Sequence, residues 1–227
     1  MSSKRDRFAQ PSSLAEIVRH YKAVFDEPNA EQIQLFQSQK SLRAAVRLAG
    51  LAQTPSGKRF SHQWRLRPST LLHAEAALQR RLSDLRRAAT FHELWECVQS
   101  AIGDIRGVGE LTVYDTAIRI GAFLRLEPER VYLHAGTREG ARSLSLGAGR
   151  EWLEIRELPV QFRQLKGRRL EDVLCIYKRE LKSLMRGLQP NKALERAVKH
   201  RWPHRARHGL RARRGGMASR PAAQQVR

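Results

Sequence analysis

The sequence predicts an all-α fold, a compact helical bundle followed by a disordered basic tail. Apolar residues recur at helical spacing through most of residues 12–188, and no segment alternates clearly enough to indicate a sheet. A chain of 227 residues is long enough for one domain with a substantial core. We therefore expect a helical domain over 12–188, between a flexible N-terminus (1–11) and a basic tail (189–227).

Capping residues and apolar periodicity place the individual helices. Ser13 with Glu16, and Thr90 with Glu93, form capping boxes at helix starts. Asn29 is expected to cap a second helix, and Thr137 a short helix after the apolar run 131–133. The expected helices cover about 14–25, 29–52 with a break near Ser38, 69–87, 90–102, 111–124, 150–156, 158–166 and 170–186.

The excess of basic over acidic residues indicates what kind of molecule the protein binds. Lys and Arg total 43 against 22 acidic residues, which gives a formal net charge of +21. Such an excess favours a polyanion, with nucleic acid first and an anionic membrane surface second. No run of about 18 apolar residues could span a bilayer, and the N-terminus lacks the apolar segment of a secretory signal. We expect double-stranded DNA as the partner and no membrane.

The tail carries much of this charge. Residues 191–227 hold eleven Lys or Arg and one acidic residue, Glu195. Such a segment cannot bury itself and would bind polyanions without sequence preference. Its removal should lower the salt dependence of DNA binding and spare base selectivity.

The cysteines give little sign of a metal site. Cys97 and Cys175 lie far apart in apolar helical contexts, as expected of buried free thiols in a reducing compartment. No Cys and His spacing is typical of a zinc or iron–sulfur site, so no metal ligands are predicted.

The stretch from Ile102 to Ile118, I-G-D-I-R-G-V-G-E-L-T-V-Y-D-T-A-I, is the most informative in the chain. Two glycines one residue apart suit a tight turn between helices, because glycine accepts positive φ and close backbone approach. The second helix would then offer its first amides to a phosphate. The alternative is a plain glycine turn between packed helices. The residues expected to bind DNA here are Gly107, Gly109, Glu110, Leu111 and Thr112.

A second cluster lies in the loop 57–67, where basic residues alternate with aromatic ones and an amide. Gln63 or Trp64 could fill the gap left by a flipped base, with basic neighbours on phosphates. Equally, Phe60 and Trp64 could simply pin the loop to the core. The expected DNA-contacting residues are Lys58, Arg59, His62, Gln63, Trp64 and Arg65, joined by Arg138 downstream.

Residues 90–145 resemble the helix-hairpin-helix DNA glycosylase superfamily, and the hairpin is the specific part of the match. That family follows its hairpin with a Val-Asp-Thr-His string, to which Val131-Tyr-Leu-His134 is similar. Tyr132 here stands where the family has its catalytic aspartate. Leu111 stands where some members have a lysine for lyase chemistry, so the resemblance implies a monofunctional glycosylase without lysine-dependent lyase activity.

The resemblance implies a helical protein that flips a modified base out of the duplex and removes it. A looser similarity to small bacterial and phage-related proteins implies hypermodified cytosine as a substrate, antiviral defence as a role and the bacterial cytoplasm as the location. It implies a monomer without a cofactor other than a monovalent cation held by hairpin carbonyls. The alternatives are a non-catalytic helix-hairpin-helix DNA-binding protein and an RNA-associated basic protein.

Cleavage of a glycosidic bond needs a carboxylate near the developing positive charge of the sugar. Asp115 and Glu139 are the catalytic candidates, although each could instead stabilise the N-terminal end of its helix. Glu129 is a weaker candidate in an expected exposed turn. His134 could orient a carboxylate or contact the base, or satisfy a local hydrogen bond. Tyr114 and Tyr132 are the candidates for a base pocket, with a core role as the alternative.

Overall fold

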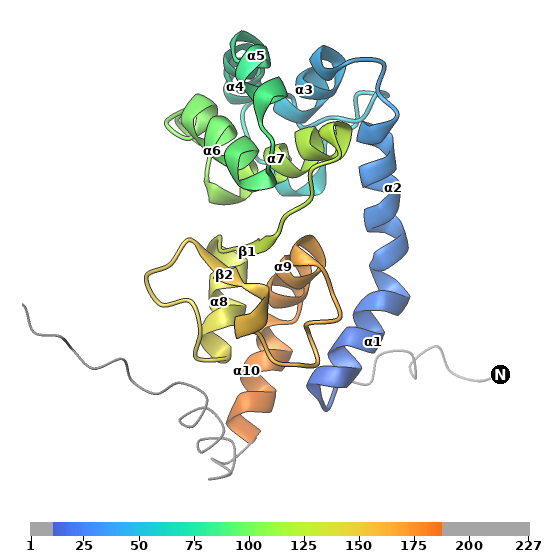
Figure 1. The fold of residues 1–227 in the computed structure, drawn as a ribbon, viewed down its shortest axis with the longest axis vertical. Coiled ribbons are helices and arrows are strands. Elements are labelled where there is room, and N and C mark those ends of the chain that lie inside the picture. Colours follow the sequence, from blue (N-terminus) through green and yellow to red (C-terminus); the bar gives the residue numbers. More distant parts are fainter. Residues whose placement is uncertain (1–10, 188–227) are drawn as a thin grey trace, which may run out of the picture. The chain divides into compact units, whose positions relative to one another are not determined.

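The computed structural model describes residues 11–187, apart from the side chains of residues 26–29. The predicted basic tail and almost all of the predicted N-terminal segment lie outside these residues. Within them, ten α-helices, two short 3-10 helices and one two-stranded sheet form the fold (Figure 1). The mainly helical class is confirmed. No helix in the described range has the length and hydropathy needed to cross a bilayer.

The helices and strands follow one another in a simple order along the chain. They are α1 (Leu14–Val24), α2 (Asp26–Gln37), α3 (Leu42–Gly50), η2 (Ser61–Gln63), α4 (Pro68–Arg80), α5 (Leu82–Arg87), α6 (Phe91–Ile102), α7 (Glu110–Leu124), β1 (Arg130–Tyr132), α8 (Ala135–Ser143), β2 (Trp152–Glu154), η3 (Ile155–Glu157), α9 (Gly167–Ile176) and α10 (Lys178–Gly187).

Both predicted capping boxes begin helices. The hydroxyl of Ser13 accepts a hydrogen bond from the amide of Glu16, and that of Thr90 accepts one from the amide of Glu93, each at 3.2 Å. These bonds satisfy amides that the first turn of a helix leaves without a partner. The helices expected over 90–102 and 111–124 are confirmed as α6 and α7.

The prediction that Asn29 caps the second helix is wrong. α2 begins at Asp26, directly after α1, so Asn29 lies inside it. Pro28 falls in the first turn, where a missing amide breaks no helical hydrogen bond, and therefore does not interrupt the helix. The break expected near Ser38 is present, and Ser41 caps α3 by accepting from the amide of Ala44 at 3.2 Å.

The C-terminal half departs further from the prediction. The segment expected as a helix over 150–156 contains β2 and η3, and residues 158–166 form turns. β2 pairs antiparallel with β1, with Val131 opposite Leu153. Strands of three residues are too short to show an alternating pattern, which is why the sequence did not indicate a sheet. The helix expected over 170–186 is divided between α9 and α10.

Two apolar clusters fill the interior, and β1 contributes to both. α3, α4, α6 and α7 surround the first cluster, and α1, α8, α9 and α10 surround the second (Figure 1). Tyr132 packs in the first cluster, whereas its neighbours Val131 and Leu133 pack in the second. Successive side chains of a strand point to opposite faces, so this short strand joins the two clusters.

Candidate functional site

The turn between α6 and α7 lies at the surface. Gly107 adopts a φ of +97°, which favours glycine, and both Gly107 and Gly109 are exposed. The turn is anchored from below, because the hydroxyl of Thr70 donates to the carbonyl of Arg106 at 3.3 Å. The amide of Val108 also donates to the carbonyl of Ile105 at 2.8 Å. The sequence prediction of a glycine turn between two helices is therefore confirmed, and the turn faces solvent.

The first turn of α7 leaves backbone amides open. Thr112 and Val113 donate to the carbonyl of Gly109, at 2.8 and 3.1 Å. Among the described residues, no acceptor bonds the amides of Gly109, Glu110 and Leu111. Exposed amides at the positive end of a helix dipole form a favourable place for a phosphate.

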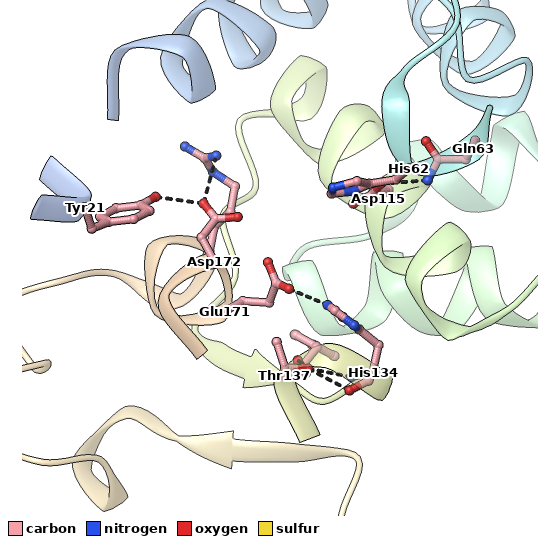
Figure 2. Close-up of polar contacts among 10 residues, drawn as sticks. Tyr21, His62, Gln63, Asp115, His134, Thr137, Glu171 and Asp172 are labelled. Carbon is pink, nitrogen blue, oxygen red and sulfur yellow. Dashed lines mark hydrogen bonds and ion pairs between the residues drawn. The ribbon is translucent and has the colours of Figure 1, made fainter. Parts of the chain in front are cut away.

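Asp115 lies one and a half turns further along α7 and is held by three donors. Its Oδ2 accepts from Gln63 Nε2 at 2.7 Å, and also contacts His62 Nδ1 at 3.1 Å and Arg119 Nη2 at 3.3 Å. Figure 2 shows His62 and Gln63 reaching Asp115 from the loop before α4. Because all three bonds reach Oδ2, Asp115 Oδ1 keeps no partner within the described part of the chain.

The surroundings of Asp115 keep it ionised. Burial by itself raises its pKa, but Arg119, His62 and Gln63 together hold the pKa below its usual range. The hydrogen bond to Asp115 raises the pKa of His62. Arg119 is 2% exposed, and its guanidinium lies 4.3 Å from the centre of the Phe60 ring. The result is a fixed carboxylate with an accessible side, since the Asp115 side chain is 16% exposed.

An aromatic pocket with a volume of about 160 Å³ opens beside the first turn of α7. The Tyr132 ring centre lies 5.1 Å from that of Trp95 and 5.7 Å from that of Tyr114. Tyr132 Oη bonds His92 Nδ1 at 3.0 Å, whereas the buried Tyr114 Oη has no partner among residues 11–187. The pocket is lined by Trp95, Gln99, Glu110, Tyr114, Tyr132, Leu133, His134, Arg138 and Glu151.

His134 and Glu171 form a buried pair at the wall of this pocket. His134 Nε2 and Glu171 Oε1 share a hydrogen bond, which Figure 2 shows running from α9 to the start of α8. Burial lowers the pKa of His134 to about 4 and raises the pKa of Glu171 to about 8. Both shifts favour the uncharged forms of the two groups, the neutral imidazole of His134 and the protonated carboxyl of Glu171.

The backbone around His134 is fixed by Thr137. The amide of His134 donates to Thr137 Oγ1 at 2.7 Å, and this hydroxyl donates to the carbonyl of His134 at 2.9 Å. Thr137 was predicted to cap a short helix here. Instead His134 occupies the cap position and Thr137 is the third residue of α8.

Arg138 and Glu110 connect α8 to α7 at the edge of the pocket. Arg138 Nη1 lies 2.8 Å from Glu110 Oε2, and Arg138 Nη2 lies 3.1 Å from Glu110 Oε1. This two-pronged contact pairs the carboxylate that lies in the first turn of α7 with a positive charge. Both residues were predicted to contact DNA, and the structure shows them bound to each other.

Glu139 does not join the pocket. Its carboxylate forms an ion pair with Lys178 of α10 at 2.8 Å, and its side chain is 47% exposed. Lys178 lowers the pKa of Glu139, as expected for a surface ion pair. The structure therefore places the Glu139 carboxylate against α10 and apart from the pocket. Glu129 is also exposed and lies outside the pocket.

The loop before α4 divides into inward and outward residues. Gln63 is fully buried, and Arg59 donates to the carbonyl of Leu66 at 2.8 Å, so both serve the loop itself. Phe60 packs against the core, with its ring centre 6.0 Å from that of Phe36. Trp64 is 64% exposed, and the Arg65 guanidinium lies 4.9 Å from its ring centre. Lys58, Trp64 and Arg65 thus face outward, and His62 is also exposed although it bonds Asp115.

A broad, shallow hollow of about 530 Å³ lies between α4 and α6, next to the glycine turn. Its floor is formed by alanines and Ile105, and the basic side chains of Arg80 and Arg106, with His73, line it. The sequence did not indicate this surface, because its residues come from two separate segments, 73–80 and 101–106. The hollow places Arg80 and Arg106 beside the turn.

Sequence reasoning missed Trp95, Gln99, Leu133 and Glu151 of the pocket, and also Arg119 and Glu171 beside it. Arg119 could have been found, since it follows Asp115 by four positions and therefore lies on the same helical face. Glu171 offered no such signal, because its partner His134 is 37 residues away. Comparisons with protein-family models, with curated proteins and with solved structures each found no match.

Proposed function

We propose that this protein binds double-stranded DNA, flips a modified base out of the duplex and removes it as a monofunctional DNA glycosylase. The observation that supports this most is the arrangement along α7. Its first residues offer open amides, Glu110 and Tyr114 line the aromatic pocket, and Asp115 supplies an ionised carboxylate. One helix thus carries a phosphate site, part of a base pocket and the charge that the reaction needs.

In this proposal the glycine turn acts as a helix-hairpin-helix element. A DNA phosphate would accept from the amides of Gly109, Glu110 and Leu111, with the basic hollow beside it binding the neighbouring backbone. Lys58 and Arg65 would contact further phosphates, and Trp64 would stack in the gap left by the flipped base. A monovalent cation at the turn's carbonyls remains a prediction.

The aromatic pocket suits a single flat ring. Its volume of about 160 Å³ is smaller than the roughly 300–1,000 Å³ of sites for drug-sized ligands. Tyr132 and Trp95 offer ring faces, and the unpartnered Tyr114 hydroxyl is a buried group that a polar base edge could satisfy. His134, uncharged at neutral pH, presents an imidazole in the same wall.

Asp115 would stabilise the positive charge that develops on the sugar as the glycosidic bond breaks. Its free Oδ1 would face that charge while Oδ2 stays bound to Gln63, His62 and Arg119. The hydrogen bond to Asp115 raises the pKa of His62 and so favours the protonated imidazole, which would donate a proton to the departing base. Residue 111 is leucine, so no lysine is available there for lyase chemistry.

The test is to incubate the full chain with unmodified DNA and with DNA carrying hypermodified cytosine, and to score abasic sites by alkaline strand cleavage. Asp115→Asn should reduce abasic-site formation by roughly 100-fold or more, as loss of one charge-stabilising group does. Glu139→Gln is the matched control and should leave the rate unchanged. Equal rates for Asp115→Asn and the parent protein would remove Asp115 from the mechanism.

The second candidate function is a DNA-binding protein without catalysis. The observation that favours it is the full occupation of Asp115 Oδ2 by three donors, which is also how a purely structural carboxylate is held. Tyr132 in place of the family's catalytic aspartate agrees with it. Tight, salt-sensitive binding without abasic sites on any substrate would establish this alternative.

A further inference from the structure

Three side chains of metal-ligating type converge where α8 meets α9. His134, Glu171 and Cys175 each offer one ligand atom, and these atoms all lie within 4.8 Å of one another. His134 and Glu171 are buried, and Cys175 is partly buried. Nothing in the proposed DNA function uses Cys175, so this cluster calls for a separate account.

The backbone brings these three residues together by construction. Glu171 and Cys175 are four positions apart on α9 and therefore share one face of that helix. His134 stands at the cap of α8, where Thr137 fixes its backbone. Gly136 allows the close approach, since a Cβ at this position would lie 2.6 Å from Cys175 Sγ.

The two helices also cross unusually closely one turn further on. A Cβ on Gly140 would lie 2.1 Å from the carbonyl oxygen of Leu174, a backbone atom that cannot move aside. Glycine at this position therefore keeps α8 against α9 and holds the cap of α8 beside Glu171. The ligand atoms belong to two helices whose separation is fixed by backbone contact.

The donor set selects the class of metal. A thiolate, an imidazole and a carboxylate together suit Zn²⁺ and related divalent transition metals, whereas Ca²⁺ and Mg²⁺ prefer oxygen ligands throughout. Three protein ligands are also the number found in zinc sites that keep a position for water or substrate. His134 lines the aromatic pocket as well, which gives such a site an approach from solvent.

We propose that His134, Glu171 and Cys175 bind one divalent transition-metal ion, with Zn²⁺ as the first choice. The Cys175 thiol and the Glu171 carboxyl give their protons to solvent as the ion binds, and His134 binds through its neutral imidazole. The site does not depend on DNA binding or base excision. It adds a metal-binding property to the chain whatever the fate of the proposed function.

Co²⁺ titration of the full chain, after removal of metal with a chelator, tests the ligand set. Binding at this site produces a thiolate-to-cobalt charge-transfer band, which ions held by histidines elsewhere do not give. The band should persist in Cys97→Ser and vanish in Cys175→Ser. Absence of the band from the parent protein, or its persistence in Cys175→Ser, would overturn the proposal.

A second measurement does not require a ligand variant to fold. In Cys97→Ser the sole thiol is Cys175, so its alkylation rate can be followed directly. Zn²⁺ should slow this alkylation at least tenfold, and an unchanged rate would overturn the proposal. Glu171→Gln should weaken Co²⁺ binding by more than the roughly 10–100-fold that loss of a ligand's outer hydrogen-bond partner causes. Unaltered affinity would exclude Glu171 as a ligand.

Discussion

Gln63 donates its side-chain amide to Asp115 at 2.7 Å across 52 residues of sequence, and its carbonyl oxygen accepts from Arg119 Nη2 at 2.9 Å. One buried amide therefore bonds both members of an ion pair on α7. It also fixes the loop that carries Trp64 against the helix that carries the glycine turn. A residue first expected to enter DNA instead organises the surface that would bind it.

Gln63→Ala should destabilise the protein by about 1–3 kcal/mol, because it removes a partner from the buried Arg119 and from Asp115 together. Chemical denaturation measured by circular dichroism gives the free energy of unfolding. Gln161→Ala is the control, since Gln161 is exposed and its loss should change stability by less than about 0.5 kcal/mol. Equal effects of the two substitutions would show that the Gln63 bridge contributes nothing.

His62 should titrate above its ordinary pKa because of its hydrogen bond to Asp115, and Asp115→Asn should bring that pKa down. NMR titration of the imidazole measures both. A pKa of His62 that is the same in Asp115→Asn and in the parent protein would show that the two groups are not coupled.

His62 and Asp115 should make the free energy of unfolding depend on pH, both near neutral pH and at acidic pH. The raised pKa of His62 means that its contribution is complete below about pH 6.5, its unfolded value, and is lost as pH rises through the higher folded value. The lowered pKa of Asp115 means that its contribution is present above about pH 3.9 and is lost as pH falls through the lower folded value. Unfolding curves collected across both ranges, for the parent protein and Asp115→Asn, check these signs.

Arg138→Ala should lower the affinity for DNA and change the free energy of unfolding only slightly. The Arg138 side chain is 24% exposed and that of Glu110 is 57% exposed, so the pair contributes no more than about 1 kcal/mol to stability. Without Arg138, the Glu110 carboxylate would repel a phosphate at the start of α7. Glu110→Gln should therefore strengthen binding in fluorescence anisotropy at low salt. Weaker binding by Glu110→Gln would place the phosphate elsewhere.

Trp64→Ala should leave stability within about 0.5 kcal/mol of the parent value, since the side chain is 64% exposed. Affinity for DNA that contains an abasic-site analogue should fall, because stacking on a base contributes about 1–3 kcal/mol. Val160→Ala, at another exposed apolar residue, should change neither quantity. If affinity survives the loss of Trp64, the loop does not enter the duplex.

The sequence anticipated the features that depend on local chemistry. Local backbone contacts determine the helix starts at Ser13 and Thr90 and the glycine turn. The sequence therefore predicted each of these features at the correct residue. The pairing of β1 with β2 and the approach of Glu171 to His134 depend on contacts between distant segments. Such short strands and isolated side chains produce no periodic pattern in the sequence. Asn29 failed as a cap because α2 already begins at Asp26, and Pro28 in its first turn does not interrupt it.

Asp115 stands on a helix whose opposite side, at Val113, Ala117 and Ile120, is buried in the larger apolar cluster. A carboxylate on such a support cannot travel toward its target without disrupting the interior behind it. In the proposed reaction the movement must therefore come from the nucleic acid, with the sugar rotating out to meet a stationary charge. Duplexes that open easily at the altered base would then be processed fastest, independently of how tightly they are held.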